Sequence, residues 1–147
     1  MTTKTDSQSF TLEFDLPHPP AKVWRALTEP DLLAKWLMPT DMQPVLGKSF
    51  TFKAQLPAGS KGWDGTVSCE MKEIEEHKRL RYSWRGNGID TVVTWTLAAT
   101  PKGGTLLRLE QAGFRLDKGE ARFFEGAKMG WQQKAGQRLP EVLTQVR

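Results

Sequence analysis

The chain has 147 residues and a formal net charge of +4, a length that suits one domain with its own core and no structural metal. Lysine and arginine are scattered along the chain, so a nucleic-acid-binding surface is not expected. No apolar run approaches the roughly 20 residues that span a bilayer, so membrane insertion is not expected. Seven Phe, six Trp and one Tyr predict an interior dominated by aromatic packing.

The cysteine content and the start of the chain indicate a compartment. Cys69 is the single cysteine, so no intrachain disulfide can form, and residues 1–9 are polar with no apolar signal segment. A reducing, cytoplasmic setting is the prediction. Residues 1–8 are expected to be a flexible N-terminal segment, and residues 9–146 a single domain.

The first elements are a strand and two short helices. Apolar and polar residues alternate over 10–16, which predicts a strand with one buried face. Prolines end it, and Pro20 suits the first turn of a helix that buries Val23, Trp24 and Leu27. A second short helix begins at residues 28–31, where cap chemistry, a proline and an acid come together, and it closes before Pro39.

Alternation then returns and predicts five more strands, over residues 50–55, 66–74, 80–85, 91–99 and 105–111. The separators are short and rich in turn residues or charge, so neighbouring strands should be antiparallel. From Phe124 to Val146 apolar residues recur every three or four positions, which predicts a long amphipathic helix.

Three glycines and a proline interrupt this helical pattern. Gly126, Gly130 and Gly136 each cost a helix roughly 1 kcal/mol against alanine, so they suggest close backbone approach or a break. Pro140 cannot donate to the carbonyl of Gly136, which predicts a bend between these two residues. The fold class is α+β: a six-stranded twisted antiparallel sheet, two short helices after the first strand, and a long C-terminal helix across the sheet.

Several segments carry a family resemblance in the same order along the chain. Residues 23–30 read Val-Trp-Arg-Ala-Leu-Thr-Glu-Pro and are followed by Lys-Trp at 35–36, residues 47–52 read Gly-Lys-Ser-Phe-Thr-Phe, and residues 80–84 read Leu-Arg-Tyr-Ser-Trp. The strand over 104–114 ends in Gly-Phe, and Gly130-Trp131 opens the closing helix. This order resembles the START-like helix-grip (SRPBCC) superfamily, most closely its branch related to the activator of the heat-shock-chaperone ATPase (AHSA-type). The chain departs at Lys48, where a second glycine is usual, and at Gln111, where histidine is frequent.

The resemblance implies a helix-grip domain with a cavity between the sheet and the last helix, used in the superfamily for lipids, polyketides and other apolar small molecules. Strand phase places mainly apolar residues toward that space, with a few polar atoms among them. Trp36 and Trp131 are expected near the cavity mouth. The candidate ligand-binding residues are Trp36, Phe52, Cys69, Met71, Tyr82, Trp84, Trp95, Leu109, Gln111 and Trp131. Periodicity reports facing and not volume, so an open cavity and a filled core remain equal alternatives.

Acid–base catalysis is not favoured, because the strand carboxylates Glu13, Asp15, Glu70 and Glu110 fall on the outward phase. His18 and His77 lie in loops and are expected to be solvated, and Cys69 is expected to be an inert core thiol. These residues do not have metal-ligand spacing, and residues 86–88 read as a hairpin turn and not as a phosphate loop. No catalytic residue, metal or cofactor is predicted.

Three functions compete. The first is noncatalytic binding of an aromatic or lipid-like small molecule. The second, implied by the family branch, is a chaperone-interacting module with a role in the stress response, acting through outward basic residues on the sheet: Lys53, Lys72, Arg81, Arg85 and Arg108. The third is a polyketide cyclase or aromatase that uses Tyr82 and Gln111 to orient its substrate. The oligomeric state is left open between monomer and homodimer.

Overall fold

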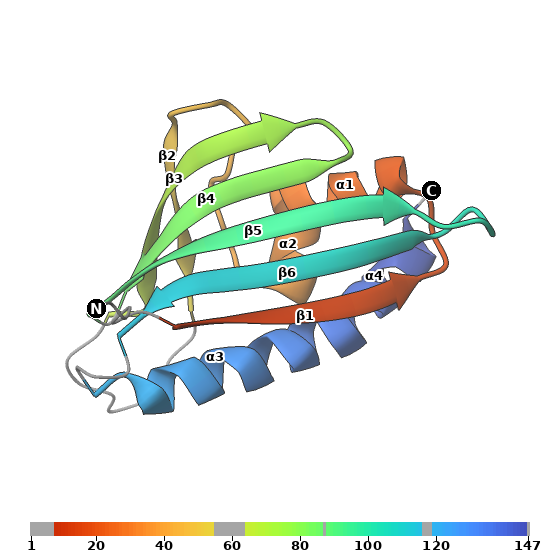
Figure 1. Ribbon diagram of the computed structural model, residues 1–147. Helices are drawn as coiled ribbons and strands as arrows, with labels where there is room; N and C mark the ends of the chain where they lie inside the picture. The colour runs from red at the N-terminus through yellow and green to blue at the C-terminus, as the bar shows by residue number, and fades with distance from the viewer. Residues whose placement is uncertain (1–7, 55–63, 87, 116–118, 147) are drawn as a thin grey trace.

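A curved antiparallel sheet of six strands forms one layer of the protein (Figure 1). The structure is a computed structural model that describes residues 8–54, 64–86, 88–115 and 119–146. The strands are β1 (Gln8–Leu16), β2 (Ser49–Lys53), β3 (Thr66–Glu75), β4 (Arg79–Gly86), β5 (Ile89–Ala99) and β6 (Thr105–Phe114). Their order across the sheet is β1-β6-β5-β4-β3-β2, so the first and last strands in sequence are neighbours.

Short connections produce this order, as the turn residues predict. Gly88 and Gly103, in the turns before β5 and β6, have φ of 83° and 85°, a region that favours glycine. The predicted strand over 50–55 ends at Lys53, and Gln55 lies outside the described residues. Asn87 of the predicted hairpin turn and residues 1–7 of the predicted flexible segment also lie outside them, while Gln8 begins β1.

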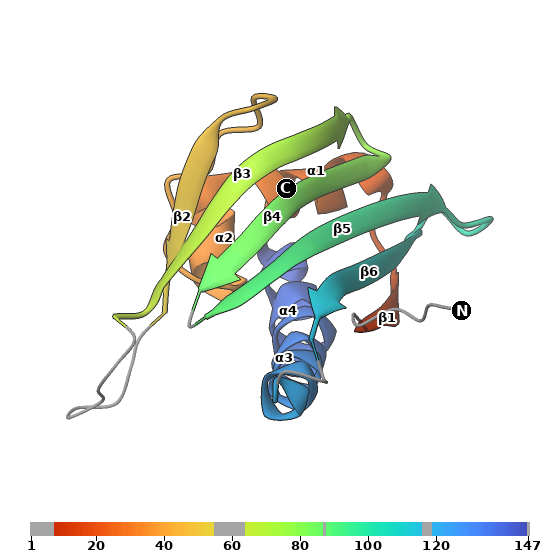
Figure 2. The ribbon, with the colours of Figure 1, turned by 60° about the vertical axis from the view of Figure 1, so that its left-hand side comes forward.

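The helices cover the concave face of the sheet. After β1 come α1 (Pro20–Thr28) and α2 (Pro30–Trp36), each with proline in its first turn. The C-terminal helical segment consists of α3 (Ala121–Gln133), a π-helical turn η2 (Lys134–Arg138) and α4 (Leu139–Gln145). Figure 2 looks almost along α3 and shows it beneath the sheet, with α1 and α2 on the same side. Both groups of helices meet where α2 packs against η2 and α4.

Around Gly136, where the sequence predicts that a bend begins, the helix contains the π-helical turn η2. The backbone N–H of Leu139 donates to the carbonyl of Lys134, five residues back, and Pro140 then lies in the first turn of α4. A π turn accommodates a residue that cannot join the regular ladder, which is why it falls directly before the proline. The long helix is therefore three successive helical segments.

The core follows the strand phases. The residues with inward phase are buried, with Trp84 only partly so: Phe50, Phe52, Val67, Cys69, Met71, Leu80, Tyr82, Val93, Trp95, Leu97, Leu107, Leu109 and Gln111. The indole N–H of Trp36 donates to the carbonyl of Ala26 at 2.8 Å, and that of Trp95 to the Tyr82 hydroxyl at 2.9 Å. These bonds let two large polar-tipped rings lie in the interior without an unsatisfied donor. In the described part of the chain, no helix has the length and apolar content needed to cross a membrane.

Candidate functional site

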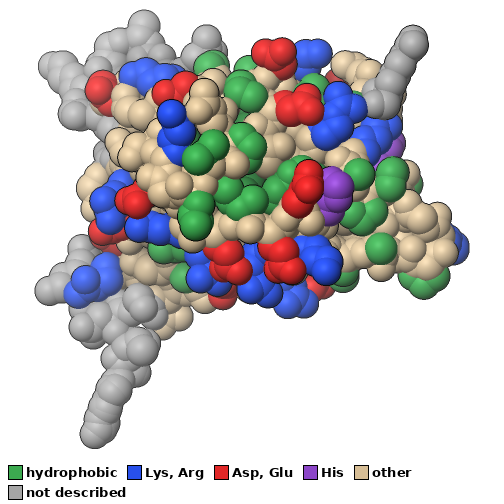
Figure 3. Space-filling model, turned by 90° about the horizontal axis from the view of Figure 1, so that it is seen from above, with side chains coloured by type: hydrophobic (Ala, Val, Ile, Leu, Met, Phe, Trp, Pro, Cys, Tyr) green, Lys and Arg blue, Asp and Glu red, His purple; other side chains and the backbone are tan. Residues whose placement is uncertain are grey.

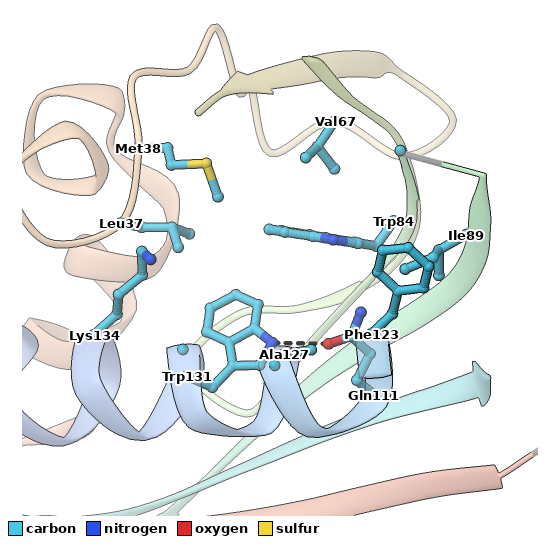
Figure 4. A pocket seen from close by; sticks show the side chains of 13 residues that line it. Leu37, Met38, Val67, Trp84, Ile89, Gln111, Phe123, Ala127, Trp131 and Lys134 are labelled. Carbon is cyan, nitrogen blue, oxygen red and sulfur yellow. Dashed lines mark hydrogen bonds between the residues drawn. The ribbon is translucent and has the colours of Figure 1, made fainter. Parts of the chain in front are cut away.

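A cavity of about 270 Å³ lies between the sheet and α3. Figure 4 shows Trp131 rising from α3, with Trp84, Val67 and Met38 on the opposite side of the space. The cavity is lined by Leu37, Met38, Val67, Trp84, Gly86, Ile89, Gln111, Phe123, Gly126, Ala127, Gly130, Trp131 and Lys134. The interior is thus filled by side chains over most of its extent and hollow beside α3. Of the two alternatives left open by the sequence, the filled core describes most of the interior and the open cavity describes the space beside α3.

Three parts of the chain build this space. The sheet contributes residues of inward phase from β3, β4 and β6, which include Val67, Trp84 and Gln111. The segment that follows α2 contributes Leu37 and Met38. The third wall is one face of α3 and η2, whose lining residues recur at steps of three and four because a helix turns every 3.6 residues.

A chain of hydrogen bonds holds the tryptophan at the centre of the wall. The indole N–H of Trp131 donates to Gln111 Oε1 at 2.8 Å, and Gln111 Nε2 donates to Thr91 Oγ1 at 2.9 Å. Thr91 Oγ1 in turn donates to the carbonyl of Trp84 at 2.9 Å. Gln111 and Thr91 are each 1% exposed, so these bonds are shielded from water. Gln111 therefore positions the ring of Trp131 and ties it to the strand that carries Trp84.

Aromatic rings form the floor and wall of the cavity. The centroids of Trp84 and Trp131 are 5.2 Å apart with an interplanar angle of 59°, and Trp131 also meets Trp95 edge-on at 5.3 Å. Behind Trp84 lies Phe52, with ring centroids 5.3 Å apart. Trp84 is only partly buried, so part of a large apolar ring still faces the space.

Two glycines leave the helix wall of the cavity bare. At both Gly126 and Gly130 an added Cβ would meet no atom within 4 Å. The expectation of close backbone approach is therefore wrong at these two positions, since the space in front of them is open. Close backbone approach does occur at Gly136, where an added Cβ would lie 3.4 Å from the ring of Phe14.

Lys134 brings a cation to this lining. It is half-buried, and burial, followed by repulsion from Arg138, lowers the pKa of its ammonium group. Among the described residues that line the cavity, it is the one ionisable side chain.

The predicted ligand-binding residues divide into two groups. Trp84, Gln111 and Trp131 line the cavity. The others lie in the packed core, each at most 4% exposed and away from this lining: Trp36, Phe52, Cys69, Met71, Tyr82, Trp95 and Leu109. Trp36 is thus a core residue and not a residue of the mouth, because its ring packs edge-on against Trp95 and bonds the backbone of α1.

The buried thiol and phenol groups of the core, Cys69 and Tyr82, ionise less readily than in water. Burial, with a smaller contribution from Asp41, raises the pKa of the Cys69 thiol to about 12, so the thiolate is scarce at neutral pH. Burial also raises the pKa of the Tyr82 hydroxyl. Within the described residues, no three His, Cys, Asp or Glu side chains are grouped so as to hold a metal ion.

On the helix side, sequence reasoning predicted Trp131 but missed the other lining residues, and on the sheet it missed Thr91. Phe123, Ala127 and Lys134 lie at helical spacing from Trp131, so the predicted position of Trp131 could have led to them. The apolar stripe of this helix begins at Phe124 in the sequence pattern. The ring of Phe124 packs edge-on against Phe10 and Phe114 and does not line the cavity.

The fold and the cavity define the class of the protein: a START-like helix-grip domain, in which a curved sheet and a C-terminal helix enclose an apolar space. The chain belongs to the family described as Activator of Hsp90 ATPase homolog 1-like protein, whose model matches residues 17–144. Among proteins of curated function, none matches the chain.

Several solved structures are similar over nearly the whole chain. Protein MLL2253 from Mesorhizobium loti is 39% identical, with a TM-score of 0.83, 94% of this chain covered and 98% of that one. Protein CV1439 from Chromobacterium violaceum is 26% identical, with a TM-score of 0.74 and coverage of 92% and 96%. Protein NE0264 from Nitrosomonas europaea is 24% identical, with a TM-score of 0.76 and coverage of 97% of both chains, and supports the fold alone.

Proposed function

We propose that the protein is a noncatalytic binder of a small aromatic or otherwise apolar molecule, which it holds between the sheet and α3. The observation that carries the proposal is the cavity of about 270 Å³ beside Trp84 and Trp131. Ligand pockets usually measure about 300–1,000 Å³ and combine apolar walls with a few polar groups. A space of about 270 Å³, just below this range, suits a compact ring system better than a long-chain lipid held whole.

The bare helix wall supports this proposal. Glycine in the middle of a helix costs roughly 1 kcal/mol against alanine, so Gly126 and Gly130 lower the stability of α3. At both positions there is room for a side chain. Gly126 is exposed and Gly130 partly buried, so alanine at either position would strengthen the helix without a clash, whereas glycine at both keeps the cavity side of α3 free of side chains.

The ionisable groups of the lining do not favour catalysis. Proton transfer needs an acid or a base that can reach the substrate, and Lys134 is the one ionisable group among the described lining residues. The cyclase alternative relies on Tyr82 and Gln111. The Tyr82 hydroxyl lies in the core, where it accepts a hydrogen bond from Trp95, and the Gln111 amide is engaged by Trp131 and Thr91.

A chaperone-interacting module is the second candidate, favoured by the family to which the chain belongs. Its proposed basic surface is largely neutralised within the protein, because its cations pair with neighbours on the sheet: Lys72 with Glu70, Arg81 with Glu73, Arg85 with Asp90 and Arg108 with Glu13. Lys53 is hydrogen bonded to Thr66. Figure 3 shows positive and negative side chains interspersed on one face. An acidic partner would have to displace these pairs, and a negative pull-down with purified chaperone at low salt would remove this candidate.

The decisive experiment for ligand binding obstructs the cavity without disturbing the core. Gly130→Leu places a side chain in the open space of the lining, and Gln132→Leu adds the same side chain to the exposed face of α3. Titration of tryptophan fluorescence with a panel of small aromatic compounds should give a saturable change in the wild type and in Gln132→Leu. In Gly130→Leu the Kd should rise by about tenfold or more. No saturable change in the wild type, or equal affinity in Gly130→Leu, contradicts the proposal.

A further inference from the structure

The two ends of the cavity differ in chemistry. Lys134 and Leu37 lie on one side, while Ile89 and Phe123 lie on the other, with Trp84 and Trp131 between them (Figure 4). One end thus presents a primary ammonium group, and the rest of the lining is apolar or is a hydrogen-bonded amide. A ligand that matches this wall has an apolar ring body and one negatively charged group.

The ammonium group of Lys134 is not balanced by the protein. Burial lowers the pKa of Lys134, and the positive charge of Arg138 lowers it further. In the described part of the chain no carboxylate forms an ion pair with it. A half-buried ammonium group without a counter-ion attracts an anion more strongly than one in bulk water, because the surroundings screen it less.

The geometry of the lining also limits where the anion can bind. Gln111 is a neutral amide whose oxygen accepts from Trp131 and whose nitrogen gives one of its two N–H groups to Thr91, so it offers an anion at most one uncharged donor. The indole N–H of Trp131 is likewise already used. One N–H of Gln111 Nε2 is not used by these bonds, but it is neutral, so among the described lining side chains Lys134 is the one charged hydrogen-bond donor.

We propose that the cavity selects amphipathic organic anions, compact aromatic molecules that carry a carboxylate or sulfonate, and that Lys134 is the residue that binds the anionic group. This inference rests on the proposed binding function, which it deepens by naming the ligand class. A charge-assisted hydrogen bond to the ammonium group, together with its partial burial, should favour the anion over an equally shaped neutral molecule by about tenfold in Kd.

The test uses matched ligand pairs that share one ring body and differ in one group. Naphthoate is compared with naphthamide, and anilinonaphthalene sulfonate with phenylnaphthylamine, each titrated calorimetrically into the full chain. Lys134→Met removes the charge and keeps an apolar stem of similar reach. Lys128→Met is the matched control, because Lys128 also lies on the C-terminal helical segment but does not line the cavity.

The wild type and Lys128→Met should bind the anion of each pair about tenfold more tightly than its neutral partner, at one site. Lys134→Met should lose this preference and keep the affinity for the neutral partner. Binding of both partners with an unchanged ratio in Lys134→Met overturns the anion inference and leaves the binding function standing. Failure of every probe to bind the wild type, or equal binding of both partners by Gly130→Leu and the wild type, overturns both.

Discussion

The bond between Trp131 and Gln111 gives a quantitative test of how the cavity wall is held. Gln111→Met keeps an unbranched side chain of similar length but removes the oxygen that accepts the indole N–H at 2.8 Å. Trp131 is 4% exposed, so the N–H would stay buried without an acceptor. A buried donor left unsatisfied costs about 1–3 kcal/mol of the free energy of unfolding. The adjoining cavity can admit a water molecule, which places the expected loss in the lower half of this range.

A double-mutant cycle separates this bond from other effects of the substitution. Trp131→Phe removes the indole N–H together with part of the ring. It should cost less in the Gln111→Met background, because the donor is then already unpaired. The expected coupling energy is about 1 kcal/mol. Thr91 is not part of the cycle, since its hydroxyl still donates to the carbonyl of Trp84.

The assay is urea unfolding of the four proteins, followed by far-UV circular dichroism so that the signal does not depend on tryptophan. Residues that do not interact give additive changes within about 0.3–0.5 kcal/mol. A coupling energy inside that limit would refute the reasoning and would mean that Gln111 does not hold the ring. A coupling near 1 kcal/mol, with a ligand Kd that also rises in Gln111→Met, would establish it as a positioning residue.

Two further predictions concern stability. Cys69 has its pKa raised from 9.0 to about 12 in the folded state, so the unfolded state loses the thiol proton first, and stability should fall by about 1.4 kcal/mol per pH unit between these values. Urea midpoints from pH 8 to pH 11 should show this extra slope in the wild type and not in Cys69→Ala; parallel curves would contradict it. Gly126→Ala should raise the free energy of unfolding by up to about 1 kcal/mol, since its Cβ meets no atom within 4 Å. Gly104→Ala should instead lower it by about 2 kcal/mol or more, because the new Cβ would lie 2.5 Å from the carbonyl oxygen of Leu16, and thermal melts that rank the two variants alike would refute the contrast.

Much of the fold could be predicted from local patterns. Alternation along the strands assigns Phe52, Tyr82 and Trp95 to the inward face, and all three are buried. Turn residues predict the antiparallel order, and Pro140 marks the region where the regular α-helical hydrogen bonding gives way to the π turn. These features depend on the stereochemistry of a few neighbouring residues, so they can be predicted from the local sequence.

The division between core and cavity depended on tertiary structure. Trp36 and Trp84 are both large inward rings, yet Trp36 is fully enclosed by its bond to α1 and its contact with Trp95, while Trp84 faces the hollow beside α3. The curvature of the sheet and the distance of α3 from it decide which ring has neighbours on every side. Period and phase contain no information on that distance.

Lys134 illustrates the same limit for the site. By sequence it is one of many lysines, and its place in the lining follows from the rotation of α3 and η2 against the sheet and from the segment that brings Leu37 opposite it. The sequence by itself determined the order of the elements and the direction in which their side chains point, because both are properties of the local backbone. The tertiary structure alone decided where the packing stops and which polar group lies at that boundary, because volume and burial arise only when segments distant in sequence come together.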